Sequence, residues 1–121
     1  MKKRVFISSI FAIFFVTAAP AWATNINFEI ATYNFAYNAT YGPNLHLWNA
    51  DYSRHAFISF TRGEVPADPI TYNPVNGEVV VIYSIDEFSN IQDLLKYSSS
   101  VFFDYMDYGD GNESAYLYSN P

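Results

Sequence analysis

Residues 104–113, "DYMDYGDGNE", bring four acidic side chains, two glycines and an asparagine together near the end of the chain. Carboxylate and amide oxygens are calcium ligands, and Asp107, Asp110 and Asn112 supply them at close spacing. The stretch does not match an EF-hand loop, because the third position counted from Asp107 is a glycine and the twelfth a tyrosine. The same residue types are typical of turns, in which Asn, Asp and Gly tolerate a positive φ. We therefore expect a hairpin turn, with weak calcium binding by these three residues as the alternative.

Both histidines of the chain lie in "LHLWNADYSRHAFISFT", residues 45–61, which has the pattern of a β-hairpin. If the hairpin closes symmetrically about Ala50 and Asp51, His46 lies opposite His55, with their Cβ atoms about 5 Å apart. Two imidazoles at that distance are able to share a metal ion, although a zinc site usually takes three protein ligands. A register shift of one residue would send the side chains to opposite faces. We interpret both as polar strand residues, with a metal site at His46 and His55 as the alternative.

Aromatic side chains are the most frequent candidate contacts for a ligand. Phe, Tyr and Trp make up 19 of the 98 residues in 24–121. Tyr and Trp offer rigid contact area, and Asn amides offer adaptable hydrogen bonds, so an aromatic and amide-rich surface suits a carbohydrate, peptide or protein ligand. The alternative is that each ring is half-buried on a strand with its hydroxyl in water. The residues that we expect to be exposed, because they adjoin turns, are Trp48, Tyr52, Tyr72, Tyr108 and Tyr116.

Signals for catalysis are absent from the sequence. The chain has no cysteine, which excludes thiol catalysis and thiolate metal sites. It has no G-x-S-x-G or S-x-x-K motif and no glycine-rich phosphate loop. We therefore expect a small binding module rather than an enzyme, with no cofactor; weakly bound calcium is the alternative. The alternative is a calcium- or metal-binding protein that uses loop 107–112 or the histidine hairpin.

The first 23 residues have the layout of a secretory signal peptide. Basic residues 2–4 precede an apolar run at 5–16, and Ala21 and Ala23 occupy the −3 and −1 positions of a cleavage site. A membrane anchor is the alternative, but it would need about 20 apolar residues. We expect a secreted or periplasmic bacterial protein, residues 24–121, with no membrane insertion after cleavage.

Removing residues 1–23 leaves three basic residues against twelve acidic ones, a net charge of −9. Affinity for nucleic acids and for anionic lipids comes from Lys and Arg. The sequence therefore predicts no nucleic-acid partner, and it leaves an unknown protein or a carbohydrate as the expected partner.

The elements that would position these residues are mostly strands. Alternation at 26–30 predicts a strand with one buried face, and 32–41 continues it, either as one bent strand or as two joined near Asn34. Asn76-Gly77 predicts a type I′ turn between a short strand at 70–72 and the β-branched run "EVVVIY", residues 78–83. That run has the composition of a central strand buried on both faces.

One helix is expected after this strand. Ser84 and Glu87 form a capping box, and an apolar stripe at helical spacing includes Ile85, Phe88 and Leu95. Strand, helix and strand over 78–106 predict a right-handed crossover with the two strands parallel. The predicted fold is a single α+β domain, with a mixed, mostly antiparallel sheet of five to seven strands and one amphipathic helix on one face. The alternative is an all-β sandwich with a covering helix.

Overall fold

The structure, a computed structural model, describes residues 24–40 and 42–119. The predicted signal peptide, residues 1–23, lies outside the described residues. No helix in the described part of the chain is long and apolar enough to cross a membrane. The elements in chain order are β1 (Asn25–Glu29), β2 (Thr32–Asn38), β3 (Gly42–Trp48), β4 (His55–Thr61), β5 (Ile70–Asn73), β6 (Glu78–Ser84), the 3-10 helix η1 (Ile85–Glu87), α1 (Phe88–Tyr97), β7 (Val101–Asp107) and β8 (Glu113–Ser119).

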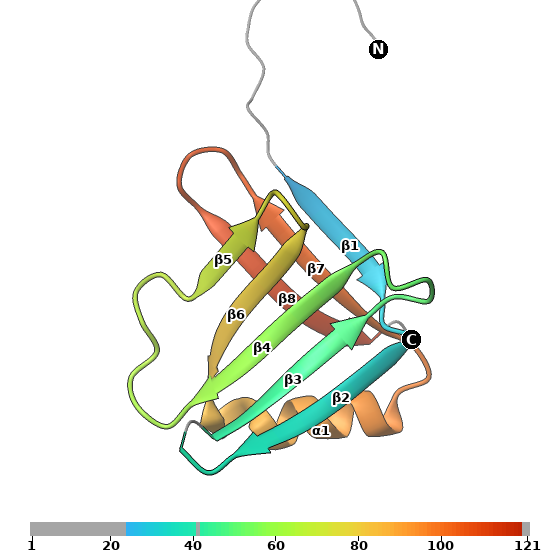
Figure 1. The fold of residues 1–121 in the computed structure, drawn as a ribbon, viewed down its shortest axis with the longest axis vertical. Coiled ribbons are helices and arrows are strands. Elements are labelled where there is room, and N and C mark those ends of the chain that lie inside the picture. Colours follow the sequence, from blue (N-terminus) through green and yellow to red (C-terminus); the bar gives the residue numbers. More distant parts are fainter. Residues whose placement is uncertain (1–23, 41, 120–121) are drawn as a thin grey trace, which may run out of the picture.

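The strands form two sheets, in the orders β1-β7-β8 and β2-β3-β4-β6-β5. All neighbouring strands are antiparallel except β4 and β6. Figure 1 shows the three-stranded sheet behind the five-stranded one, with α1 across one end of the two layers. The structure confirms the predicted α+β class with mostly antiparallel strands and one amphipathic helix. The strands are divided between two sheets, as in the sandwich alternative, rather than gathered in one.

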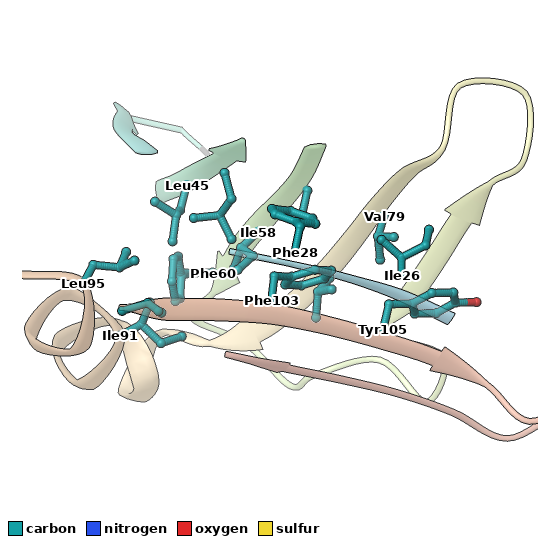
Figure 2. Close-up of a cluster of buried hydrophobic side chains, with 14 residues drawn as sticks. Ile26, Phe28, Leu45, Ile58, Phe60, Val79, Ile91, Leu95, Phe103 and Tyr105 are labelled. Atoms are coloured by element: carbon teal, nitrogen blue, oxygen red, sulfur yellow. The ribbon is translucent and has the colours of Figure 1, made fainter. Parts of the chain in front are cut away.

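The core lies between the two sheets, and Figure 2 shows side chains from both layers meeting there. In β3 and β4 buried residues alternate with half-buried ones, so each strand has an inner and an outer face. Leu47 and Ile58 on the inner face are fully buried, and the rings of Phe28 and Phe103 pack with centroids 5.5 Å apart. Full burial of a side chain of this size stabilises the fold by about 1.5–3 kcal/mol.

The predicted parallel pairing of "EVVVIY" with "VFFDYM" is wrong. These runs are β6 and β7, which belong to different sheets; β6 lies between β4 and β5, and β7 lies between β1 and β8. The handedness rule for a strand-helix-strand unit applies only to strands of one sheet, and here the helix leads from one sheet to the other. The central position of β6 is as predicted, but its residues alternate between buried and half-buried, so only one of its faces is covered.

The helix begins as predicted at Ser84, whose Oγ accepts a hydrogen bond from Asp86 N at 3.2 Å. Glu87 does not complete the capping box; its carboxylate instead accepts a bond from Asn90 Nδ2 at 3.4 Å. Ile91 and Leu95 of the apolar stripe are buried against the end of the sandwich. Figure 2 shows both side chains directed towards the core.

Two connections differ in detail from the sequence expectation. The bend between β1 and β2 lies at Ile30 and Ala31 rather than near Asn34; Ile30 N donates to Val101 O and Ala31 N to Trp48 O, both at 2.9 Å. These bonds join one chain segment to both sheets. The β5–β6 hairpin is confirmed, but its loop spans residues 74–77 because Asn73 pairs with Glu78, with φ of Gly77 at 73°.

Candidate functional site

The acidic loop between β7 and β8 has the geometry of a turn. Asp107 Oδ1 accepts a hydrogen bond from Gly109 N at 2.9 Å, and Asp110 Oδ1 accepts one from Asn112 N at 3.0 Å. Gly109 and Gly111 have φ of 82° and 91°, a region that favours glycine. The carboxylates thus hold the turn itself. Within residues 24–40 and 42–119 no group of three or more His, Asp or Glu side chains is placed to hold a metal ion.

The two histidines share a face of the β3–β4 hairpin, but they are not opposite each other. Trp48 pairs with His55 and His46 with Phe57, because the hairpin centre lies between Asp51 and Tyr52, one residue later than expected. His46 and His55 are therefore diagonal neighbours, with ring centroids 5.9 Å apart. Partial burial, and secondly the neighbouring His55, lower the pKa of His46, while Glu78 opposes this.

Four rings gather on the outer face of the five-stranded sheet; we call His46, Trp48, His55 and Phe57 the ring cluster. The centroid of Trp48 lies 5.5 Å from that of His46 and 5.6 Å from that of His55. The planes of these three rings lie within 19° of one another. Phe57 meets His46 edge-on at 4.6 Å. All four rings are half-buried, so the cluster is both packed and accessible.

A hydrogen-bonded loop places Tyr52 beside the ring cluster. Asn49 closes this loop: its Oδ1 accepts from Arg54 N at 2.9 Å and its Nδ2 donates to Ser53 Oγ at 3.0 Å. Tyr52 has φ of 62°, the single positive value at a non-glycine residue in the described chain. Its ring lies 6.2 Å from that of Trp48 and is 62% exposed. A bulky residue in this conformation costs free energy, and such strain concentrates at functional sites.

A pocket of about 470 Å³ opens at the other end of the same face. The outward-facing residues of β4 run from the ring cluster into it: His55 and Phe57 belong to the cluster, and Ser59 and Thr61 line the pocket. The loop after β4 adds Arg62. The outer face therefore changes from aromatic to polar along one strand.

The other predicted contact residues are dispersed. Tyr72 faces inward from β5 and stacks on Tyr105 at 5.5 Å, because Ile70 and Tyr72 alternate with outward-facing residues. Tyr108 lies on the acidic loop and is 52% exposed. Tyr116 lies on the outer face of the three-stranded sheet, on the opposite side of the sandwich.

Sequence reasoning missed Phe57 and Arg62 as members of a site. The signal for Phe57 was available, since alternation in "HAFISF" places His55 and Phe57 on one face and Ala56, Ile58 and Phe60 on the other. No local pattern marks Arg62, whose neighbours come from distant parts of the chain.

No protein family, curated protein or solved structure matches this chain. Its function has to be inferred from its own residues.

Proposed function

We propose that this chain is an exported, non-catalytic binding module that holds a carbohydrate chain on the outer face of its five-stranded sheet. The observation that carries the proposal is the ring cluster with Tyr52 beside it. The rings of His46, Trp48 and His55 stack with their planes within 19° of one another, which makes a preformed aromatic array on this face, and Tyr52 lies beside it. A rigid, preformed surface binds with a smaller entropy cost than a flexible one.

The chemistry of this face suits a sugar chain. Aromatic faces pack against the C–H surface of a sugar ring, and nearby amides and hydroxyls exchange hydrogen bonds with its hydroxyl groups. Thr32 and Asn34 of β2 supply such groups next to Trp48 and His46, with which they pair across the strands. Strand pairing places no Lys or Arg beside the ring cluster, which argues against a polyanionic ligand there.

The geometry around the histidines supports binding rather than catalysis. His55 Nε2 lies 3.3 Å from Glu78 Oε2, a pairing that in hydrolases orients a general base. Such a base needs a nucleophile within hydrogen-bond reach. In the described part of the chain, no Ser or Thr hydroxyl bonds to His46 or His55. The Glu78 carboxylate instead holds the His55 ring in the cluster.

The proposal of export rests on the sequence of residues 1–23, and it places the module in the periplasm or outside the cell. The absence of cysteine is compatible with either compartment, because a fully buried set of inner-face residues supplies the core without disulfides. N-terminal sequencing of the exported protein should give Thr24 as the first residue. An intact Met1 on membrane-bound protein would contradict export by cleavage.

Affinity electrophoresis through gels that contain a neutral β-glucan, xylan or mannan tests the binding function. At least one polysaccharide should retard the wild-type protein, and Trp48→Ala should migrate as in a gel without polysaccharide. Tyr97→Ala is the matched control, since Tyr97 is 74% exposed on α1, away from the sheet face, and its loss should change nothing.

Two results would overturn the proposal. Equal retardation of the wild type and Trp48→Ala would mean that the sugar binds elsewhere. The absence of retardation, together with Trp48-dependent binding to an array of extended peptides, would make the face a peptide site.

A further inference from the structure

The pocket at the polar end of the outer face contains a guanidinium group that has no acidic partner among the described residues. Arg62 is one of three basic residues in residues 24–121, against twelve acidic ones. The single salt bridge among residues 24–40 and 42–119 joins His55 and Glu78. In so acidic a chain, an arginine would readily gain a carboxylate partner from the protein itself. Because Arg62 has none among the described residues, its positive charge is available to a ligand in the pocket.

The Arg62 guanidinium lies close to Gly42, in space that a side chain at this position would occupy. A Cβ on Gly42 would lie 3.0 Å from Arg62 Nη1, so the guanidinium rests directly against the glycine backbone. Gly42 also has φ of 84°, a conformation that other residues adopt only with strain. The first residue of β3 therefore provides the space that directs Arg62 over the pocket.

The pocket also carries unused neutral hydrogen-bonding groups. Thr40 and Ser59 line it with hydroxyls, and Thr61 Oγ1 is fixed by a bond from Gly63 N at 3.2 Å. Next to Ser59 on the same face, Asn44 Oδ1 is buried and accepts no hydrogen bond from the described residues. A buried acceptor without a donor is rare in native proteins.

The pocket and the ring cluster form one elongated surface. His55, Phe57, Ser59 and Thr61 project from the same side of β4, and at 3.3 Å per residue they span about 20 Å. A single extended ligand can therefore contact the rings and Arg62 together. Such a ligand needs an anionic group at one end and hydroxyl groups along its length.

We infer that the Arg62 pocket binds the carboxylate of an acidic sugar, a hexuronate unit of the carbohydrate chain held by the ring cluster. The identification of the ligand as a carbohydrate chain rests on the proposed function. The binding of a carboxylate is inferred from the pocket alone. A guanidinium and a carboxylate form paired, charge-assisted hydrogen bonds. The net charge of −9 on residues 24–121 favours a ligand chain that carries few carboxylates over a polyanion, which these residues together would repel.

NMR titration with methyl glucuronoside and methyl glucoside, which differ in one carboxylate, tests the inference. The glucuronoside should shift the Arg62 side-chain Nε–H resonance saturably and bind at least about tenfold more tightly than the glucoside, as expected for a charged hydrogen bond. Arg62→Gln should remove this preference. Lys96→Gln, which removes an equal charge on α1, should retain it.

The same experiment separates the two proposals. If Arg62→Gln loses the preference for the glucuronoside and Trp48→Ala keeps it, the carboxylate binds in the Arg62 pocket. This conclusion holds whichever ligand the ring cluster binds. Equal binding of the two glycosides, or an unchanged preference in Arg62→Gln, overturns the inference while leaving neutral-sugar binding at Trp48 intact. Stronger binding of a peptide with a free C-terminal carboxylate, relative to its amide, would also overturn the assignment to a sugar.

Discussion

The outer faces of the two sheets are both rich in aromatic residues, yet they differ in how their polar groups are used. On the three-stranded sheet, Asn27 Nδ2 donates to the Tyr118 hydroxyl at 3.1 Å, and Tyr118 stacks on Phe102 at 5.5 Å. On the five-stranded sheet, Asn44 Oδ1 and the Arg62 guanidinium have no protein partner within the described chain.

This difference supports the proposal that the ligand binds on the five-stranded sheet. On the three-stranded sheet, Asn27 and Tyr118 bond across strands, and the face carries carboxylates at Glu29 and Asp104. On the five-stranded sheet, the carboxylate of Glu78 pairs with His55. The five-stranded sheet combines aligned rings, a strained loop residue and unsatisfied polar atoms. Buried polar groups are nearly always paired in native proteins, so the unpaired Asn44 Oδ1 distinguishes this face from the other. Aromatic content alone would not distinguish the two faces.

The largest expected effect is a difference in stability between variants on the inner faces of the two sheets and variants on their outer faces. Ile58→Ala and Phe103→Ala should each lower the free energy of unfolding by about 2–5 kcal/mol, because both side chains are fully buried. Phe57→Ala and Phe102→Ala, their neighbours on the outer faces, should cost about 1 kcal/mol, since half of the apolar contact remains in water. Urea denaturation midpoints measure all four. If Ile58→Ala and Phe57→Ala lowered the free energy of unfolding equally, or if Phe103→Ala and Phe102→Ala did so, the inner and outer faces would be misassigned.

A smaller effect is expected at the polar end of the five-stranded sheet. Gly42→Ala and Gly77→Ala both place a side chain at positive φ, which should cost about 1–2 kcal/mol. A Cβ at Gly77 meets open space, whereas one at Gly42 displaces Arg62. Because Arg62 Nη1 is the end of a flexible side chain and can move aside, Gly42→Ala should cost about as much stability as Gly77→Ala, but it should weaken the glucuronoside preference. Retention of that preference would show that Gly42 does not position Arg62.

Replacing Tyr52 should change stability and polysaccharide binding in opposite directions. Tyr52→Gly removes the positive-φ strain and should raise the free energy of unfolding by up to about 1 kcal/mol, while weakening polysaccharide retardation. Tyr108→Gly, at a loop residue with ordinary φ beside the three-stranded sheet, should bring no gain and leave retardation unchanged. Thermal melts and affinity gels give the two readouts. A Tyr52→Gly protein that is both less stable and fully active would remove Tyr52 from the site.

These elements differ in how far the sequence could predict them. Alternation at Ile26 and Phe28 and the cap at Ser84 depend on neighbouring residues, so β1 and the helix were predictable. The division into two sheets was not, because the uniform run of β6 gives no period that separates its faces. The hairpin register depends on the conformation of Tyr52, and the pocket depends on contact between Gly42 and Arg62. Those features arise from backbone geometry and from pairing of distant segments.

A weaker effect concerns the pH dependence of the ring cluster. The pKa of His46 is lower in the folded protein than its ordinary value, so the unfolded chain binds more protons between the two values. The contribution of His46 to stability is therefore complete above about pH 6.5 and is lost as the pH falls below it. Urea midpoints of the wild type and His46→Asn at pH 5 and pH 8 isolate this contribution. If the wild type were more stable at pH 5 than at pH 8, relative to His46→Asn, the result would contradict the burial of a neutral His46 ring.

The smallest effect is expected at the acidic loop beside the three-stranded sheet. Replacing both Asp107 and Asp110 with Asn keeps the side-chain oxygens that hold the two turns and removes two negative charges from an acidic domain. Stability should remain equal or rise slightly, and calcium should not change the melting temperature of either protein. A wild-type melting temperature that rises in millimolar calcium, with loss of that rise in the double variant, would make this loop a calcium site.

Binding on the outer face of the five-stranded sheet can be tested by mapping backbone amide shifts at saturation with an oligosaccharide of the retarding polysaccharide. The perturbed amides should lie in β3, in β4 and in the loop that carries Tyr52, together with the Trp48 indole N–H. The amides of β1, β7 and β8, behind the five-stranded sheet in Figure 1, should not move. Perturbation centred on Asn27, Phe102 and Tyr118 would place the ligand on the opposite side of the sandwich and contradict the account.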